Sequence, residues 1–247
     1  MTAGHAVRQR LKSVAGPRLT VLARCVWRRL PLPRWGNLRR IRPFSTAFGF
    51  DRGTPIDRYY LDKFLGVNRA LITGRVLEVQ VRSYTKRFGA GVRESHTVDI
   101  NPAFGATYTC DLADAAQIPS DYYDCFLVPN TFQHILDLHP ALRNMVRVVK
   151  PGGTVLASAA CLLPLIPDGG DYWRLSPEGW RLVLEGEWPG CDVTVEAHGN
   201  CLAAAAAMYG LAHEELRAAE LDAHDPRYPV LMTVRCRKPL PSSSAGA

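Results

Sequence analysis

Short apolar segments alternate with segments of helical periodicity through residues 74–158 of this 247-residue chain. Each apolar segment has the length of a strand and ends near a polar or turn-forming residue. This alternation is typical of an α/β domain in which helices connect parallel strands by right-handed crossovers. The pattern predicts strands at residues 76–81, 96–100, 106–110, 123–128 and 154–158.

Apolar stripes at helical spacing predict the helices. One stripe begins near Thr54 and continues through Tyr60, Phe64 and Val67 to about Ile72. Two more helices are expected at residues 84–88 and 140–149. A tight turn at residues 151–153 should then lead into the fifth strand.

The C-terminal third of the chain shows a different order of elements. Ser176 suits the N-cap and Pro177 the first position of a helix that reaches residue 185. Alternation predicts strands at residues 191–198 and 230–236, and an alanine-rich segment predicts a helix at 202–219 between them. The whole pattern predicts a doubly wound α/β fold with helices on both faces of a mostly parallel sheet.

Two acids mark the ends of the first two predicted strands. Glu78 lies near the end of the first strand, and Asp99 follows it by 21 residues at the end of the second. In a doubly wound domain, ligands bind where the carboxyl ends of such strands meet, and a carboxylate can accept both hydroxyl protons of a ribose. The spacing indicates a nucleoside site, although the loop after Glu78 lacks the usual glycines.

Positive charge is concentrated at the N-terminus. Residues 1–50 hold eleven Lys and Arg and no Asp or Glu, whereas the rest of the chain holds 19 basic and 23 acidic residues. We therefore expect a basic arm at 1–50, partly disordered or amphipathic, a domain at 51–238 and a flexible tail at 239–247. The arm either binds an anionic membrane surface or an acidic protein, or it is a solvated extension.

The cysteine pattern and the hydropathy bear on the compartment. Seven cysteines occur without a CxxC pair, and no apolar run reaches the roughly 20 residues that a membrane-spanning helix needs. These features predict reduced thiols in a cytoplasmic protein, peripheral at the membrane if the arm docks there. His213 and His224 lack metal-ligating neighbours, so no metal is expected.

Several motifs occur in a familiar order. They are Gly74-Arg-Val-Leu-Glu78, Asp99 after the second strand, Cys110-Asp-Leu112, the strand ending at Asn130, and Val148-Val-Lys-Pro-Gly-Gly153. In this order the chain resembles class I S-adenosylmethionine-dependent methyltransferases over roughly residues 53–237. The resemblance implies a Rossmann-like seven-stranded sheet with a C-terminal antiparallel hairpin, and S-adenosyl-L-methionine as cofactor.

Three further segments narrow the resemblance. Residues 50–60, 83–89 and 170–176 are similar to a bacterial, type 11-like methyltransferase subgroup that accompanies glycosyltransferases and enzymes of glycan or natural-product biosynthesis. This resemblance implies an O-methyltransferase that acts on a hydroxyl of a sugar, a glycoside or a natural product.

The resemblance also implies roles for individual residues. Glu78 would meet the methionine moiety of the cofactor, Asp99 the ribose hydroxyls and Asp111 the adenine amino group. Asn130 would lie where the fourth strand faces the transferable methyl group. Glu78 and Asp111 could instead be loop or helix caps, as acids at such positions often are.

The first motif departs from the family pattern at Gln80, where a glycine is usual. Glycine lets the backbone approach a ligand and adopt unusual dihedral angles. Three alternatives follow. The loop takes a wider path, in which Gln80, Ser83 and Tyr84 bind the cofactor's carboxylate; or the cofactor binds more weakly; or the site has lost the cofactor and the chain is a scaffold.

Candidate acceptor residues follow the fourth and fifth strands. His134 is the candidate general base, although a packed, hydrogen-bonded histidine fits the position as well. Asp171 could also accept a hydroxyl proton, and Tyr172, Trp173 and Arg174 beside it suit a sugar or a polar ring unless the loop is merely packed. His198, after the sixth strand, could line the same pocket.

Two functions from different classes follow from this pattern. The first is methyl transfer to a small-molecule or glycan acceptor. The alternative is a catalytically inactive, methyltransferase-like protein that binds a partner through its basic arm. Nucleic acid is not an expected substrate, because the domain is mildly acidic and carries no recognisable nucleic-acid module.

Overall fold

The computed structural model describes residues 19, 21, 25–28, 34–166 and 170–241. The chain forms two compact units, residues 1–42 and residues 43–247. The larger unit therefore begins at Pro43, earlier than the expected boundary at residue 51. In the smaller unit, the described residues include a single-turn helix, Gly36–Leu38. Many residues of the expected basic arm, which bear on whether it is disordered or amphipathic, and the tail from residue 242 lie outside the described part of the chain.

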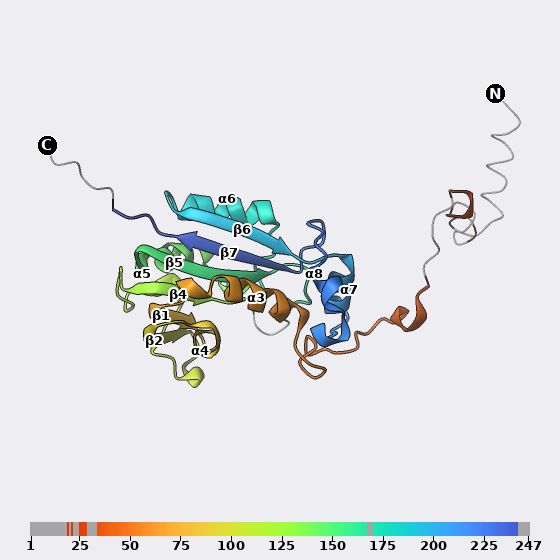
Figure 1. Cartoon of the computed structure of the whole chain (residues 1–247), viewed down its shortest axis with the longest axis horizontal. Coiled ribbons are helices and arrows are strands. Elements are labelled where there is room, and N and C mark those ends of the chain that lie inside the picture. The colour runs from red at the N-terminus through yellow and green to blue at the C-terminus, as the bar shows by residue number, and fades with distance from the viewer. Residues whose placement is uncertain (1–18, 20, 22–24, 29–33, 167–169, 242–247) are drawn as a thin grey trace, which may run out of the picture. The chain divides into compact units, whose positions relative to one another are not determined.

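The described residues of the larger unit form a seven-stranded sheet in the order β3-β2-β1-β4-β5-β7-β6 (Figure 1). Strands β1 to β5 pair in parallel, whereas β7 pairs antiparallel with both β5 and β6. The fold class predicted from the sequence, with its C-terminal antiparallel hairpin, is confirmed. The strands are β1 (Gly74–Val79), β2 (Val92–Asp99), β3 (Tyr108–Thr109), β4 (Tyr123–Val128), β5 (Val149–Ala160), β6 (Asp192–His198) and β7 (Leu231–Arg237).

Helices cover both faces of this sheet (Figure 1). They are α3 (Ile56–Val67), α4 (Ser83–Phe88), α5 (Leu138–Val148), α6 (Pro177–Glu187), α7 (Cys201–Met208) and α8 (Ala218–Asp222), with single 3-10 turns between some of them. The predicted cap of α6 is confirmed, because Ser176 Oγ accepts a hydrogen bond from the backbone N–H of Gly179.

Two apolar cores lie on the two faces of the sheet. Alternate side chains of the central strands, such as Phe126 and Leu127 of β4, point to opposite faces and are buried. The Phe126 face packs against α5 and α6, and the Leu127 face packs against α3 and α7. Because both faces are buried, the strands read as continuous apolar runs.

Two predicted elements differ from the structure. The predicted turn at residues 151–153 lies inside β5, where the pairing with β4 shifts register and Gly152 has a φ of +77°. The predicted helix at 202–219 is also wrong, because α7 ends at Met208 and the chain turns at Gly210. Gly210 has a φ of +70° and lies against the backbone carbonyl of Ser45, where a Cβ atom would clash. The alanine-rich composition does not reveal this tertiary contact.

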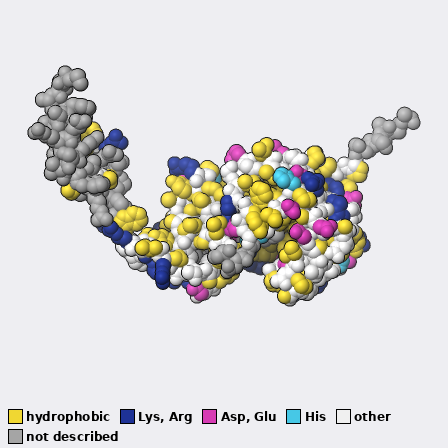
Figure 2. Space-filling view, turned by 180° about the vertical axis from the view of Figure 1, so that it is seen from behind, with side chains coloured by type: hydrophobic (Ala, Val, Ile, Leu, Met, Phe, Trp, Pro, Cys, Tyr) yellow, Lys and Arg dark blue, Asp and Glu magenta, His cyan; other side chains and the backbone are white. Residues whose placement is uncertain are grey.

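None of the described helices has the length and the apolar character that crossing a membrane requires. On the face of the molecule drawn in Figure 2, Lys and Arg side chains of the domain are interspersed with Asp and Glu and with apolar side chains.

Candidate functional site

A cavity of about 650 Å³ lies at the carboxyl ends of β1, β2 and β4, and we call it the large cavity. Parallel strands end at one edge of the sheet, which places the loops that follow them side by side. Most of the candidate residues line this cavity: Glu78, Gln80, Ser83, Tyr84, Asp99, Asp111, Asn130, His134 and Tyr172. Asp171, Trp173, Arg174 and His198 do not line it.

Glu78 is fully buried at the end of β1 and holds the first turn of α4. Its Oε1 accepts a hydrogen bond from the backbone N–H of Tyr84 at 2.9 Å, and its Oε2 accepts one from Thr85 at 2.8 Å. Burial raises the pKa of the Glu78 carboxyl, against these hydrogen bonds, which favour the charged form. Glu78 is therefore a cap of α4 as well as a lining residue of the large cavity.

Gln80 keeps the backbone conformation that a glycine would supply. Its φ is +69°, in the left-handed region, and its N–H donates to the carbonyl of Val98 at 2.8 Å. A residue with a Cβ atom is destabilised there by roughly 1–2 kcal/mol. The loop therefore retains its tight path despite the side chain, and strain of this kind is typical of functional sites.

Asp99 at the end of β2 and Asp111 after β3 also line the large cavity. Asp99 Oδ1 accepts a hydrogen bond from the backbone N–H of Asn101 at 2.6 Å, while its Oδ2 has no hydrogen-bond partner in the described part of the chain. Asp111 Oδ1 caps the single-turn helix Leu112–Asp114 through the N–H of Ala113. Asp111 therefore combines the two alternatives, since it is a cap that also lines the cavity.

Asn130 is held from two sides at the end of β4. Its Nδ2 donates to Oδ2 of the buried Asp57 in α3 at 2.7 Å, and its Oδ1 accepts from the hydroxyl of Ser158 in β5 at 2.8 Å. Its φ of +46° is a second left-handed conformation of a non-glycine residue in this cavity. The network fixes the backbone of Asn130 beside the cavity.

His134 has both ring nitrogens in hydrogen bonds. Nδ1 lies 2.7 Å from the carbonyl oxygen of Gly170, which can only accept, so this nitrogen carries the proton of the neutral ring. Nε2 is then the acceptor, and the side-chain Nε2 of Gln133 lies 3.2 Å from it. The single lone pair of the ring thus accepts from Gln133, and His134 can act as a general base toward a hydroxyl that takes the place of this hydrogen bond.

The remaining candidate acceptor residues in the loop after β5 point to different surroundings. Tyr172 lines the large cavity, and its N–H donates to the carbonyl of Gln133 at 2.7 Å. Trp173 instead packs against the core and donates its Nε1–H to the carbonyl of Ile135 at 2.7 Å. Trp173 is therefore a packed loop residue, the second of the two roles expected for this segment.

Asp171 and Arg174 form an ion pair with each other. Arg174 also donates to the carbonyls of Cys161, Leu163 and Pro164, which fastens the loop. The hydrogen bond from Arg174 lowers the pKa of the Asp171 carboxyl below its ordinary value. A carboxylate held in this way is a weak base, and the structure does not bring it to the large cavity.

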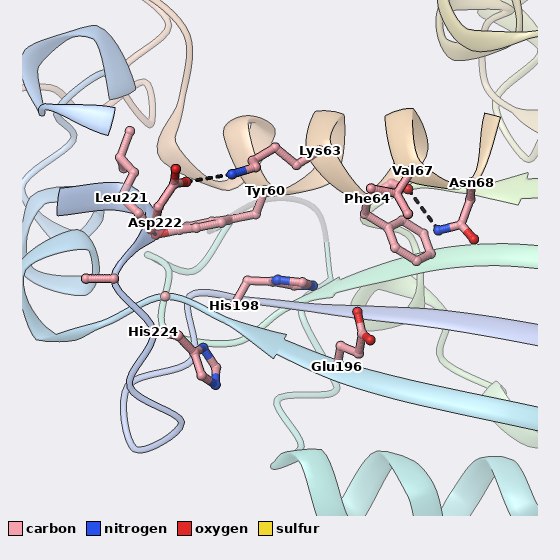
Figure 3. Close-up of a pocket in the computed structure, with 12 residues that line it drawn as sticks. Tyr60, Lys63, Phe64, Val67, Asn68, Glu196, His198, Leu221, Asp222 and His224 are labelled. Carbon is pink, nitrogen blue, oxygen red and sulfur yellow. Dashed lines mark hydrogen bonds and ion pairs between the residues drawn. The ribbon is translucent and has the colours of Figure 1, made fainter. Parts of the chain in front are cut away.

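His198 lies in a different cavity, between α3 and β6 (Figure 3). Its ring stacks on Tyr60 at 6.0 Å, and its Nε2 is 2.7 Å from the hydroxyl of Thr233. The expectation that His198 lines the acceptor pocket is wrong, because β6 is the edge strand at the other end of the sheet from β2 and β3.

Sequence reasoning missed several residues of the large cavity. The most informative is Arg58 in the first turn of α3, whose Nη1 donates to the hydroxyl of Tyr84 at 2.8 Å. Ile100 and Leu112 add apolar surface beside Asp99 and Asp111. Ile100 could have been found, because it directly follows the acid of β2, whereas no local signal brings α3 to this edge of the sheet.

A comparison with protein families matches residues 80–157 to the methyltransferase domain family. The C-methyltransferase UbiE of ubiquinone and menaquinone biosynthesis from Serratia proteamaculans is 32% identical over 87 residues, which are 30% of this chain and 35% of that protein. The protein of the same name from Proteus mirabilis is 27% identical over 131 residues, 53% and 47% of the two chains. The chain thus matches less than half the length of these relatives.

Solved structures share the fold. An S-adenosylmethionine-dependent methyltransferase from Mesorhizobium loti aligns with a TM-score of 0.52 and 16% identity over 77% of this chain and all of that one. The [4+2]-cyclase SpnF aligns with a TM-score of 0.51 and 15% identity over 82% and 88% of the chains. Since one of these proteins is a cyclase, the shared fold does not by itself identify the reaction.

The family implies S-adenosylmethionine as cofactor, and the large cavity fits this molecule. Its volume lies within the range of roughly 300–1,000 Å³ that is usual for small-molecule sites. Asp99 offers a carboxylate oxygen for a diol, and Ile100 and Leu112 offer apolar surface for a flat ring. Among the described residues, no group of three or more His, Cys, Asp or Glu side chains could hold a metal ion.

Proposed function

We infer that this protein is a class I S-adenosylmethionine-dependent methyltransferase with a small-molecule acceptor. The fold and the family match over residues 80–157 are the premises of this inference. We propose further that the acceptor atom is a hydroxyl oxygen of a sugar, a glycoside or a natural product. The relatives named UbiE are C-methyltransferases, so carbon is the competing acceptor atom.

One observation carries the proposal: Asp99 and Asp111 line the same cavity as the tight loop at Gln80. An acid at the end of β2, an acid after β3 and a left-handed residue after β1 suit the ribose, the adenine and the methionine end of one ligand. When bound, S-adenosylmethionine supplies a methyl group on a positively charged sulfur, already activated for transfer to a nucleophile.

The residues of this chain supply orientation and proton transfer. Glu78 fixes the loop and α4, and Asp99 and Asp111 orient the nucleoside. The acceptor hydroxyl replaces Gln133 at His134 Nε2, and this nitrogen takes the hydroxyl proton while the Gly170 carbonyl holds the other ring nitrogen in its protonated form. Tyr172 lines the same cavity as His134 and offers an aromatic surface there.

Calorimetric titration with S-adenosylmethionine tests the cofactor proposal directly. We expect a binding heat in wild-type protein and a weakening of roughly 10- to 100-fold in Asp99→Asn, because a charged hydrogen-bond acceptor is lost. Asp192→Asn, at the exposed start of β6, is the matched control and should bind as wild type does. No heat and no thermal shift at millimolar cofactor would refute the proposal and favour the inactive, partner-binding alternative.

We propose a separate role for the basic arm, contact with an anionic membrane surface or an acidic protein from the cytoplasmic side. Support comes from the eleven basic residues without an acid in residues 1–50. Co-sedimentation with anionic vesicles should decrease when residues 1–42 are deleted, while binding of S-adenosylmethionine stays unchanged. Equal sedimentation of both forms would exclude the membrane role.

A further inference from the structure

A second, smaller cavity of about 210 Å³ adjoins the site, and we call it the small cavity. It shares three lining residues with the large cavity: Arg58, Asn130 and His134. Because the candidate general base lines both cavities, the methyl donor can occupy the large cavity while the methyl acceptor occupies the small one. The small cavity is therefore the natural place for the acceptor.

Half of the residues that line the small cavity are apolar. Two segments far apart in the chain provide most of them, one with Phe48 and Phe50, the other with Leu163, Pro164 and Ile166. Phe50 is 61% exposed and Ile166 is 37% exposed, so the apolar surface continues outward from the cavity. Exposed apolar side chains around a cavity are typical of a binding site for an apolar ligand.

The polar groups of the small cavity are already engaged with one another. Asp57 accepts from Asn130, and Arg174 is paired with Asp171 and with backbone carbonyls. Gln133 donates to the carbonyl of Asn130 at 2.8 Å. A sugar carries several hydroxyls, and each one that loses water without a new partner weakens binding. The Nε2 atom of His134 accepts from Gln133 as well, so a bound hydroxyl reaches it only by taking the place of that hydrogen bond, which a single hydroxyl group can do.

The size of the small cavity also limits the acceptor. A cavity of roughly 150 Å³ with apolar walls accommodates a benzene molecule. About 210 Å³ therefore accommodates a single ring with one or two small substituents. A longer apolar substituent could extend along Phe50 and Ile166.

From these observations we propose that the acceptor is a hydroxylated aromatic ring, bound between the Phe48–Phe50 segment and the Leu163–Ile166 segment with its hydroxyl toward His134. This proposal rests on the proposed methyltransferase function and selects the aromatic natural products among the acceptors named there. A phenol, with a pKa near 10, also gives up its proton to histidine far more readily than a sugar hydroxyl does.

Binding measurements on the full chain test this proposal without relying on turnover. The probes are 4-ethylphenol and methyl β-glucopyranoside, each titrated in the presence of S-adenosylhomocysteine and followed by ligand-observed NMR. We expect saturable binding of the phenol and at least about tenfold weaker binding of the glucoside, since its hydroxyls would lose hydrogen bonds to water.

Substitutions locate the bound phenol. Ile166→Asp places a charge on the apolar wall and should weaken phenol binding at least about tenfold. Leu182→Asp, at an exposed position of α6, is the matched control and should have no effect. Tighter binding of the glucoside, or phenol binding unaffected by Ile166→Asp, would overturn the proposal.

Cofactor titration on the same samples separates the two levels of inference. If S-adenosylmethionine binds and the phenol does not, only the aromatic acceptor is refuted. If neither the cofactor nor the phenol binds, the methyltransferase function fails as well. Where turnover is observed, mass spectrometry of the product distinguishes methylation at oxygen from methylation at ring carbon.

Discussion

The Nη1 atom of Arg58 lies 2.8 Å from the hydroxyl oxygen of Tyr84, which joins the first turn of α3 to α4 beside the large cavity. Arg58 is held in turn by the carboxylate of Asp57, 3.4 Å from its Nε. Asp57 also accepts from Asn130, so one chain of contacts links α4, α3 and the end of β4. Three parts of the site thus depend on a helix that precedes the sheet in the sequence.

Tyr84→Phe tests this link. Loss of the hydroxyl should lower the free energy of unfolding by about 1 kcal/mol, the usual net value of one hydrogen bond. It should also weaken binding of S-adenosylmethionine, because α4 and Arg58 lose their fixed positions. Chemical denaturation and calorimetry measure the two effects. Tyr228→Phe, in the loop before β7, is the control; equal affinity in wild type and Tyr84→Phe would contradict the role in the site.

Gln80→Gly should relieve backbone strain, because glycine adopts a φ of +69° without a steric penalty. We expect the free energy of unfolding to rise by up to about 1 kcal/mol. Gln80→Ala removes the polar arm but keeps the Cβ atom and should leave stability nearly unchanged. If cofactor affinity falls equally in both variants, the Gln80 side chain binds the cofactor. If the affinity of Gln80→Ala equals that of wild type, the cofactor contacts only the backbone of this residue. A lower free energy of unfolding in Gln80→Gly than in wild type would contradict the backbone strain inferred for Gln80.

His134→Gln should reduce turnover by roughly 100- to 10,000-fold, the usual contribution of a general base, while S-adenosylmethionine binds as before.

A substitution at Gly170 tests how the backbone positions His134. Gly170 has a φ of +62°, and a Cβ atom added there would lie 2.6 Å from the Tyr172 hydroxyl oxygen. Gly170→Ala should therefore displace the carbonyl that orients His134 and shift the pH profile of turnover.

Gly186→Ala is the control for this substitution, because no atom lies within 4 Å of a Cβ added at Gly186 in α6. It should leave the pH profile unchanged. An unshifted profile in Gly170→Ala, with turnover equal to that of wild type, would show that the carbonyl does not position the histidine.

His198 should make stability depend on pH. Burial lowers the pKa of its imidazole, so the folded state holds the ring neutral while the unfolded chain takes up a proton near pH 6.5. The unfolded state then binds more protons, and the free energy of unfolding falls as the pH drops below about 6.5. Denaturation at pH 7 and pH 5 should show a smaller loss in His198→Gln than in wild type.

His224→Gln, at an exposed histidine of the same cavity, is the control for this pH effect (Figure 3). Burial is the largest cause of the lowered pKa of His198 and the charge of His224 a lesser one, so His224→Gln should lose nearly as much stability between pH 7 and pH 5 as wild type does. Identical losses in His198→Gln and wild type would refute the role of His198.

Most of the fold could be predicted from hydrophobic periodicity, because the central strands β1, β4 and β5 are largely buried on both faces and their apolar runs are short and bounded. The predicted helix at 202–219 failed for a tertiary reason. Alanine favours a helix locally, but Gly210 approaches the backbone of Ser45, a contact across the whole domain. No window of sequence contains both residues.

The candidate site likewise contains residues that local sequence could locate and residues that it could not. Glu78 and Asp99 could be located because strand ends in a doubly wound domain meet at one edge. The directions of Asp171, Trp173 and Arg174 could not, because adjacent side chains of an irregular loop follow their individual partners. Trp173 donates to the carbonyl of Ile135 and Arg174 pairs with Asp171, whereas Tyr172, which directly precedes Trp173, lines the large cavity.

The position of β7 has a consequence for biosynthesis. It follows the other six strands in the sequence, yet it lies between β5 and β6 and pairs with both. During translation β5 therefore has a bare edge, and β6 has no neighbour in the sheet, until residues 231–237 have left the ribosome. A nascent chain stalled before that point exposes unpaired strands to other chains.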